Sequence, residues 1–359
     1  MKKAIVFFAA LLMVGMTAYA QSSALVKLSA ELDTGVQDVI SFSGANMSDA
    51  VSLSYAPIGI PSRFRIGLGV GSVDGNWGIT TRLDSELLQA GGLAASWNRA
   101  LVWGKVFDNL LTFKAGLLDE EAFSFTWRPW GAENIWGAQF DGNLGVEVQV
   151  SPVSNLTIGY IFPMQKDLQA GFSFTDSLKG SNIAASYEMP GVFTIVGGVQ
   201  LSRTVNSSDA WLGVDIKAIE GLTARVAAQA MNIGDANVGW LEVYQEAGYV
   251  VWGIGLNLKA WEEFYAAANS GIGWQVEPTV SYPMGIVTLA LSGDLGNLVA
   301  QDPNPSVPAL QPFGFAVGPS ATFVLAPSST IRAGARFKVG DVNTSNATVQ
   351  TFVSFRWVF

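Results

Sequence analysis

The chain ends in Val353-Ser354-Phe355-Arg356-Trp357-Val358-Phe359, and this alternating run decides the fold. Successive side chains of an extended strand point to opposite faces. One face of the run therefore carries Val353, Phe355, Trp357 and Phe359, and the other carries Ser354, Arg356 and Val358. We expect a last strand with one face against an apolar medium and the other face against water.

The opposite end of the chain has the three parts of a secretory signal peptide. Lys2 and Lys3 precede an apolar stretch, and the small residues Ala18 and Ala20 follow it. Residues 1–20 are therefore predicted to be a cleavable signal peptide, because the apolar stretch is too short for a membrane-spanning helix. Loss of the two lysines changes the net charge from −9 to −11 for residues 21–359.

The composition favours a β-barrel in a membrane. The chain is 49% hydrophobic and 14% charged, whereas soluble domains carry about 25% charged residues. No apolar stretch after residue 20 reaches the roughly 18 residues that a spanning helix needs. A closed barrel is the other structure that satisfies every backbone polar group in hydrocarbon. The alternative, a soluble secreted β-sandwich or β-helix, leaves the apolar terminal strand without a reason.

A strand of about 8–12 residues with one apolar face recurs along the chain. In residues 63–70, Arg63 and Arg65 are predicted to face inward, while Phe64, Ile66, Leu68 and Val70 face outward. Residues 76–83 repeat the pattern with Arg82 inward. Thirteen further strands are predicted at 145–151, 155–162, 181–188, 192–201, 210–217, 221–229, 238–244, 249–258, 272–280, 284–293, 313–325, 329–338 and 348–359.

The connections between these strands alternate in length. Tight connections containing Pro or Gly lie at 151–155, 189–191, 218–221, 282–284 and 326–328. Longer polar connections are predicted at 163–180, 202–209, 230–237, 259–271, 294–312 and 339–347. Short turns on one side and long loops on the other are typical of bacterial barrels, whose short turns are periplasmic.

The number of strands follows from closure of the barrel. Residues 24–144 are less regular and must supply an odd number, because both termini are expected on the same side. Five strands there give about 18 in all, within an expected range of about 16–20. We therefore predict an all-β, antiparallel, up-and-down transmembrane barrel formed by residues 21–359.

Residue types that the chain lacks exclude several functions. There is no His and no Cys, so a His general base and metal sites built on imidazole or thiolate are excluded. No catalytic residue, metal or cofactor is predicted, and the acids at 119–121 and 262–263 are interpreted as solvated loop residues. A net negative chain without a basic tract is also not expected to bind nucleic acid.

Charged residues at inward positions are the candidate functional residues, because a basic side chain facing lipid at mid-depth costs about 2–4 kcal/mol. The basic ones are Arg63, Arg65, Arg82, Lys114, Arg225, Arg332, Arg336, Lys338 and Arg356, and the acidic ones are Glu147, Glu188, Asp215 and Glu277. Closure is expected to bring Arg332, Arg336 and Arg356 toward Arg63 and Arg65 as an arginine wall. A structural ladder of salt bridges is the alternative interpretation of that wall.

The segment 118–135 is long and aromatic for an exposed loop. Its acids are Asp119, Glu120, Glu121 and Glu133. In one interpretation the segment folds into the barrel and these acids face the arginine wall, which forms a constriction. In the other it is an irregular hairpin whose aromatic residues belong to the girdle at the membrane interface.

In size, signal peptide, turn and loop alternation and terminal aromatic residue, the chain resembles Gram-negative outer-membrane porins. Phe355, Trp357 and Phe359 are similar to the terminal signal that the barrel-assembly machinery reads. Residues 103–116 resemble the strand-turn-strand repeats of spirochaete-type porins. The acidic-loop motif of the best-known trimeric porins is not matched, so the constriction and a homotrimer rest on the general resemblance.

The resemblance implies passive, cofactor-free diffusion of small hydrophilic solutes and ions through a pore in the lipid of the outer membrane. A barrel of about 16–18 strands is wide enough for an aqueous channel. Two alternatives stay open at this point. One is a channel specific for a particular solute, and the other is a surface adhesin that binds a partner through its long loops.

Overall fold

The computed structural model describes residues 24–43, 45–55, 60–89, 92–118, 123–126, 135–137, 143–164, 181–201, 208–234, 239–265, 272–297, 313–340 and 347–358. All regular secondary structure in these residues is β-strand. No helix among them is long and apolar enough to cross a membrane. The predicted signal peptide at 1–20 and the terminal Phe359 lie outside the described residues.

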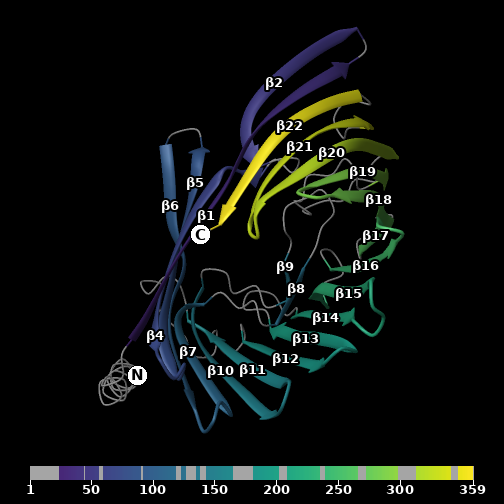
Figure 1. Ribbon diagram of the computed structural model, residues 1–359. Coiled ribbons are helices and arrows are strands. Elements are labelled where there is room, and N and C mark those ends of the chain that lie inside the picture. Colours follow the sequence, from purple (N-terminus) through teal and green to yellow (C-terminus); the bar gives the residue numbers. More distant parts are fainter. Residues whose placement is uncertain are drawn as a thin grey trace.

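Eighteen antiparallel strands form a closed ring (Figure 1), and β22 closes it by pairing with β1. The first five positions belong to β1 (Ala24–Ser43), β4 (Arg63–Ser72), β5 (Trp77–Gln89), β6 (Gly92–Val106) and β7 (Leu111–Leu118). The other thirteen are β10 (Asn143–Val153), β11 (Leu156–Pro163), β12 (Asn182–Met189), β13 (Phe193–Leu201), β14 (Ser208–Ile216), β15 (Leu222–Ile233), β16 (Trp240–Val251), β17 (Ile254–Tyr265), β18 (Ile272–Met284), β19 (Val287–Gly296), β20 (Gly314–Ala326), β21 (Ser329–Val339) and β22 (Ala347–Val358). The predicted barrel, with thirteen strands after residue 143 and five before it, is confirmed.

The place next to β1 in the barrel wall is shared by two separate segments. One edge of β1 pairs with β22, while its other edge pairs first with β4 and then with β2 (Asn46–Tyr55). Asp33 lies opposite Arg63, but Val36 already lies opposite Leu53. β3 (Ile60–Pro61) pairs with the end of β2, with Ile60 opposite Tyr55 and Pro61 opposite Ser54. β2 and β4 together occupy one position, which explains the irregular pattern in this part of the sequence.

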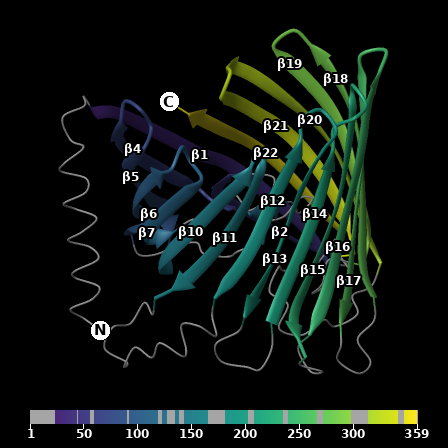
Figure 2. The same ribbon diagram turned by 90° about the horizontal axis from the view of Figure 1, so that it is seen from below.

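Tight hairpins join the strands at one end. In the two-residue turn between β16 and β17, Trp252 and Gly253 have φ values of 50° and 79°. Positive φ at both central residues is the condition for a type I′ turn, whose twist matches that of the flanking strands. Figure 2 shows the strands inclined together around the barrel.

The two faces of the wall differ in chemistry. On β22, the side chains of Val353, Phe355 and Trp357 are exposed, whereas Phe352 and Ser354 on the other face are buried. The same alternation places Ile66 and Leu68 of β4 on the exposed outer surface. The outer face of the barrel is therefore apolar, as the terminal strand predicted.

Two neighbouring strands are placed differently from the prediction. β16 runs to Val251, past the predicted end at residue 244, and the turn to β17 lies at 252–253. β17 continues through residues 259–265, where a loop was expected, and Glu262 and Glu263 are strand residues. Lys259 and Glu263 lie on the inner face, where polar side chains are common, and Glu262 lies on the outer face. The outward carboxylate breaks the apolar alternation, which is why the end of this strand was misplaced.

Candidate functional site

The inner faces of β22, β1, β4 and β5 carry a cluster of charged side chains. Pairing in register puts Asp33 of β1 between Arg356 of β22 and Arg63 of β4. Two residues further along β4, Arg65 lies between Glu31 of β1 and Asp84 of β5. We call these residues the seam cluster, because they lie where the first and last strands meet; its members are Glu31, Asp33, Arg63, Arg65, Arg82, Asp84 and Arg356.

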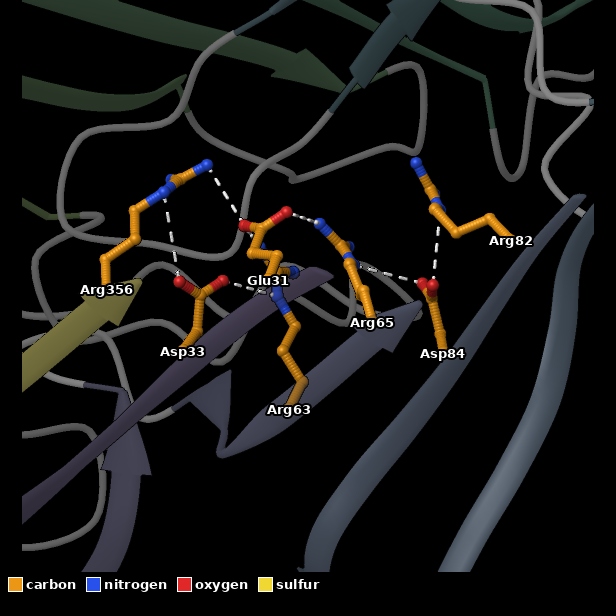
Figure 3. Close-up of polar contacts among 7 residues, drawn as sticks. All are labelled: Glu31, Asp33, Arg63, Arg65, Arg82, Asp84 and Arg356. Carbon is orange, nitrogen blue, oxygen red and sulfur yellow. Dashed lines mark hydrogen bonds and ion pairs between the residues drawn. The ribbon is translucent and has the colours of Figure 1, made fainter. Parts of the chain in front are cut away.

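Ion pairs connect the seam cluster across four strands (Figure 3). Arg356 Nη2 lies 3.0 Å from Glu31 Oε1, and Arg63 Nε donates to Asp33 Oδ2 at 2.8 Å. The distances from Asp84 to its two partners are 3.2 Å to Arg65 Nε and 3.1 Å to Arg82 Nε. Arg65 Nη1 is also 3.6 Å from Glu31 Oε2. Four arginines therefore share three carboxylates, and the cluster carries one excess positive charge.

A second row of charges follows the inner face of β14 to β18, one residue per strand. Asp215, Arg225, Glu246, Lys259 and Glu277 lie directly opposite one another in that order. Arg225 Nε is 3.2 Å from Asp215 Oδ1, and Arg225 Nη1 is 3.6 Å from Glu246 Oε2. The signs alternate along this row, which we call the charge belt, so that each cation has a carboxylate on both neighbouring strands.

The remaining predicted inner residues form smaller contacts. Arg336 Nη2 donates to Asp294 Oδ2 at 2.8 Å, so Arg336 turns toward β19 and away from the seam cluster. Lys114 Nζ lies 3.1 Å from Glu147 Oε2, and the Glu147 side chain is fully buried. The guanidinium of Arg332 lies over the ring of Phe352, 5.7 Å from its centroid.

Two predicted residues lie at the edges of this pattern. Lys338 is on the inner face of β21, opposite Ala316 and Thr348. Glu188 lies at the end of β12 and pairs with Lys217 of the β14–β15 turn at 2.9 Å. Arg356 makes ion pairs with Glu31 and Asp33 of the seam cluster, so of the expected arginine wall Arg63, Arg65 and Arg356 lie together.

The acids that neutralise these arginines are wall residues. Glu31, Asp33 and Asp84 were not singled out from the sequence, where the acids were expected mainly in loops. The signal was present in the alternation of Ser29, Glu31 and Asp33 with apolar residues in β1. The loop acids Asp119, Glu120, Glu121 and Glu133 lie outside the described residues.

An apolar cluster also lies on the inner side of the wall. It consists of Leu101, Leu118, Phe123, Ile161, Ala184, Val196 and Trp211. Phe123 belongs to the segment between β7 and β10, and its side chain is fully buried. The same segment forms the short hairpin of β8 (Ser124–Thr126) and β9 (Ile135–Gly137), which Figure 1 shows inside the ring.

Among the described residues, no group of three or more Asp or Glu side chains is arranged to hold a metal ion. The carboxylates of the seam cluster and the charge belt alternate with arginine or lysine across the strands. Glu242 of β16 and Glu263 of β17 lie directly opposite each other on the inner face, and both are buried. Such an interior can attract and orient charged solutes by electrostatics and hydrogen bonding.

Comparisons with known proteins give the fold. Neither a protein-family model nor a curated protein matches the sequence. The crystal structure of OccK9 (OpdG) of Pseudomonas aeruginosa is similar, with a TM-score of 0.61 and 11% identity over 93% of this chain and 98% of that one. A mutant of the Rh. blastica porin gives a TM-score of 0.51 and 14% identity, covering 93% of this chain and 100% of that one.

A loop-deletion mutant of OmpT, an outer membrane protein of Vibrio cholerae, is similar over 94% of this chain and 100% of that one, with a TM-score of 0.50 and 12% identity. The chain has the fold of an outer-membrane porin. In this porin fold, the seam cluster and the charge belt line different sectors of the lumen, and the hairpin of β8 and β9 lies within it.

Proposed function

We propose that the protein is an outer-membrane porin, a water-filled channel through which small hydrophilic solutes and ions diffuse passively. The apolar outer face suits the hydrocarbon of a bilayer, where a closed barrel leaves no backbone group unpaired. A ring of eighteen strands encloses a wider lumen than the roughly eight strands whose interior is filled by side chains. The charged inner face then requires water or counter-charges, and the carboxylates of the neighbouring strands supply counter-charges.

The observation that carries the proposal is the unequal exposure of the inner charges. The side chains of Arg356 and Arg225 are 40% and 32% exposed. The side chains of Asp33, Glu147 and Asp294 are fully buried beside their cations. These two arginines are more exposed to the lumen than the three buried carboxylates, and we propose a preference for anionic over cationic solutes.

Location and assembly are part of the same proposal. Residues 1–20 direct export and are removed, and the barrel-assembly machinery recognises Phe355, Trp357 and Phe359 at the end of the last strand. Exposure of Phe355 and Trp357 on the outer face supports this role. The resemblance to porins implies a homotrimer as the assembled form, which crosslinking in outer membranes tests.

Conductance in a planar lipid bilayer tests the function. A large, ohmic conductance, together with a zero-current potential of anionic sign in a salt gradient, is expected. A small conductance that one class of solute blocks would indicate a specific uptake channel instead. Purified, folded protein that inserts without any conductance would exclude a channel and favour the surface adhesin.

A further inference from the structure

Large apolar side chains lie exposed at the end of the barrel where short turns join the strands. Each hairpin that the structure describes at this end carries at least one of them, in the turn or within two residues of it. In chain order they are Val73, Phe107, Val153, Met189, Ile219, Trp252, Ile286 and Leu325. In water, this ring of residues lacks the burial that stabilises apolar groups. Exposed apolar surface of this kind marks a site of interaction.

Two of these residues are large aromatics in a backbone conformation that disfavours them. Phe107, in the turn between β6 and β7, has a φ of 54°, and Trp252, in the turn between β16 and β17, has a φ of 50°. Bulky side chains rarely adopt a positive φ, which Gly, Asn and Asp adopt more readily. Their side chains are 73% and 94% exposed. Packing within the barrel therefore does not account for an aromatic residue at either position.

The ring of apolar turn residues surrounds the whole barrel. On one side of the wall, three hairpins separate Phe107 from Trp252. On the other side, they are separated by two hairpins, the seam between β22 and β1, and the β4–β5 hairpin. The two aromatic residues therefore lie on nearly opposite sides. A protein bound at one sector would leave most of the ring uncovered, whereas a flat surface around the barrel contacts every turn.

The turns also continue the apolar outer face of the wall. Tyr249, Ile254 and Leu256 are exposed beside Trp252, so the apolar surface extends from the strands to the tip of this hairpin. The charged residues within the short turns are Asp74, Asp108, Glu220 and Lys217, and their sum is negative. This charge provides no attraction for an anionic polymer or for anionic lipid headgroups. Apolar insertion is then the mode of contact that fits these turns.

We propose that Trp252, Phe107 and the other apolar turn residues insert into the phospholipid leaflet on the short-turn side of the membrane and fix the depth of the barrel in it. Short turns of bacterial barrels face the periplasm, and aromatic girdles flank the outward-facing apolar band of their strands. The contact proposed here is made by the turns themselves. It rests on the proposed location in the outer membrane and is independent of conductance.

A fluorescent reporter measures the depth of a turn. The chain has no Cys, so Ile286→Cys provides a single thiol for an NBD label in the barrel refolded into phosphatidylcholine vesicles. Phospholipids with a nitroxide near the headgroup should quench this label strongly, and aqueous iodide should quench it weakly. Ser48→Cys is the control, because Ser48 is exposed on the inner-face side of β2, at the opposite end of the barrel. There iodide should quench the label and the lipid nitroxide should not.

A further variant tests the two aromatic residues. Trp252→Asn combined with Phe107→Asn removes both rings and keeps a residue type that suits a positive φ. Lipid quenching of the label at Ile286→Cys should decrease in this variant. Asn155→Gly is the matched control, because Asn155 is a polar turn residue of the same end with a φ of 66°, and no change is expected. A purely structural role of the rings would lower the yield of heat-modifiable barrel without moving the label.

The outcomes separate this inference from the proposed function. Iodide quenching without lipid quenching at Ile286→Cys, in an assembled barrel that floats with the vesicles, would overturn the insertion and indicate a periplasmic protein as the partner of the ring. Equal lipid quenching with and without the two rings would overturn their role in fixing the depth. A barrel that does not float with the vesicles would contradict the membrane location itself. Turns in lipid without any conductance would contradict only the channel.

Discussion

Arg356 on the last strand and Glu31 on the first strand form an ion pair of 3.0 Å on the inner face of the barrel. Arg356 also approaches Asp33, whose main partner is Arg63 at 2.8 Å. The closure of the ring therefore combines backbone pairing between β1 and β22 with a set of charge contacts that bridges the same seam.

The first prediction concerns Arg63 and Asp33. Arg63→Met removes the closest cation from a fully buried carboxylate, and loss of one partner of a buried pair costs about 3–5 kcal/mol. The assembled barrel should unfold at lower urea concentration in lipid vesicles.

Lys217→Met is the matched control, because it removes the cation of the exposed pair with Glu188. Exposed pairs contribute about 0–1 kcal/mol, so this variant should unfold close to the wild type. Equal unfolding midpoints for Arg63→Met and Lys217→Met would contradict the buried character of the seam cluster.

The second prediction concerns a close approach in β5. A Cβ at Gly78 would lie 2.6 Å from Cζ2 of Trp103 and 2.7 Å from the carbonyl oxygen of Val70. Gly78→Ala should therefore destabilise the barrel by about 1–3 kcal/mol through overpacking. Urea unfolding measures the effect, and Gly69→Ala, whose added methyl group would meet Lys27 at an ordinary contact distance of 3.8 Å, should have little effect. A Gly78→Ala barrel as stable as Gly69→Ala would show that Trp103 moves freely.

The fold could be predicted because each strand carries its own signal. Alternation in residues 63–70 and 353–359 identifies the apolar and polar faces without knowledge of the neighbours. The interrupted position shared by β2 and β4 was harder, because two separate segments occupy one place in the wall. The requirement for an odd number of strands in residues 24–144 still led to the correct number of five strand places before residue 143.

The partners of the inner charges could be predicted only in part. The face on which a side chain lies follows from the alternation of side chains along its strand. This alternation placed Arg63, Arg82 and Arg225 among the inward residues. Partners depend on the register between strands, and the neighbours of Arg356 lie more than 300 positions away in the sequence. Glu31 and Asp33 were therefore missed, although their strand has the same alternation as the others.

The third prediction concerns assembly. Deletion of Phe359, or Phe359→Ala, should lower the amount of barrel in the outer membrane, because we propose that the assembly machinery recognises the aromatic face of the last strand, which closes the ring. Export across the inner membrane should be unchanged, so the unassembled protein is expected in the periplasm. Fractionation and heat-modifiable migration measure both quantities. A normal amount of folded, inserted protein after the deletion would refute this role.

The last prediction is that the inner arginines, rather than the net charge of −11 for residues 21–359, set the ion preference. Charges on the rim lie in bulk salt, where the Debye length is about 8 Å at 0.15 M, so their field decays before it reaches the pore axis. Arg65 instead lies inside the barrel, 3.2 Å from Asp84 and 3.6 Å from Glu31. Its loss removes a cation and leaves two carboxylates less compensated.

Arg65→Gln combined with Arg332→Gln should therefore shift the zero-current potential toward cation preference, measured in a salt gradient at about 0.15 M, where the rim charges are screened. Arg332 contributes because its guanidinium lies over Phe352 on the neighbouring part of the inner face. Lys217→Gln removes one positive charge from an exposed turn and is the matched control, with no shift expected. An unchanged potential in the assembled double variant would show that these two arginines do not line the path of the ions, because a lost cation on that path must alter the local field.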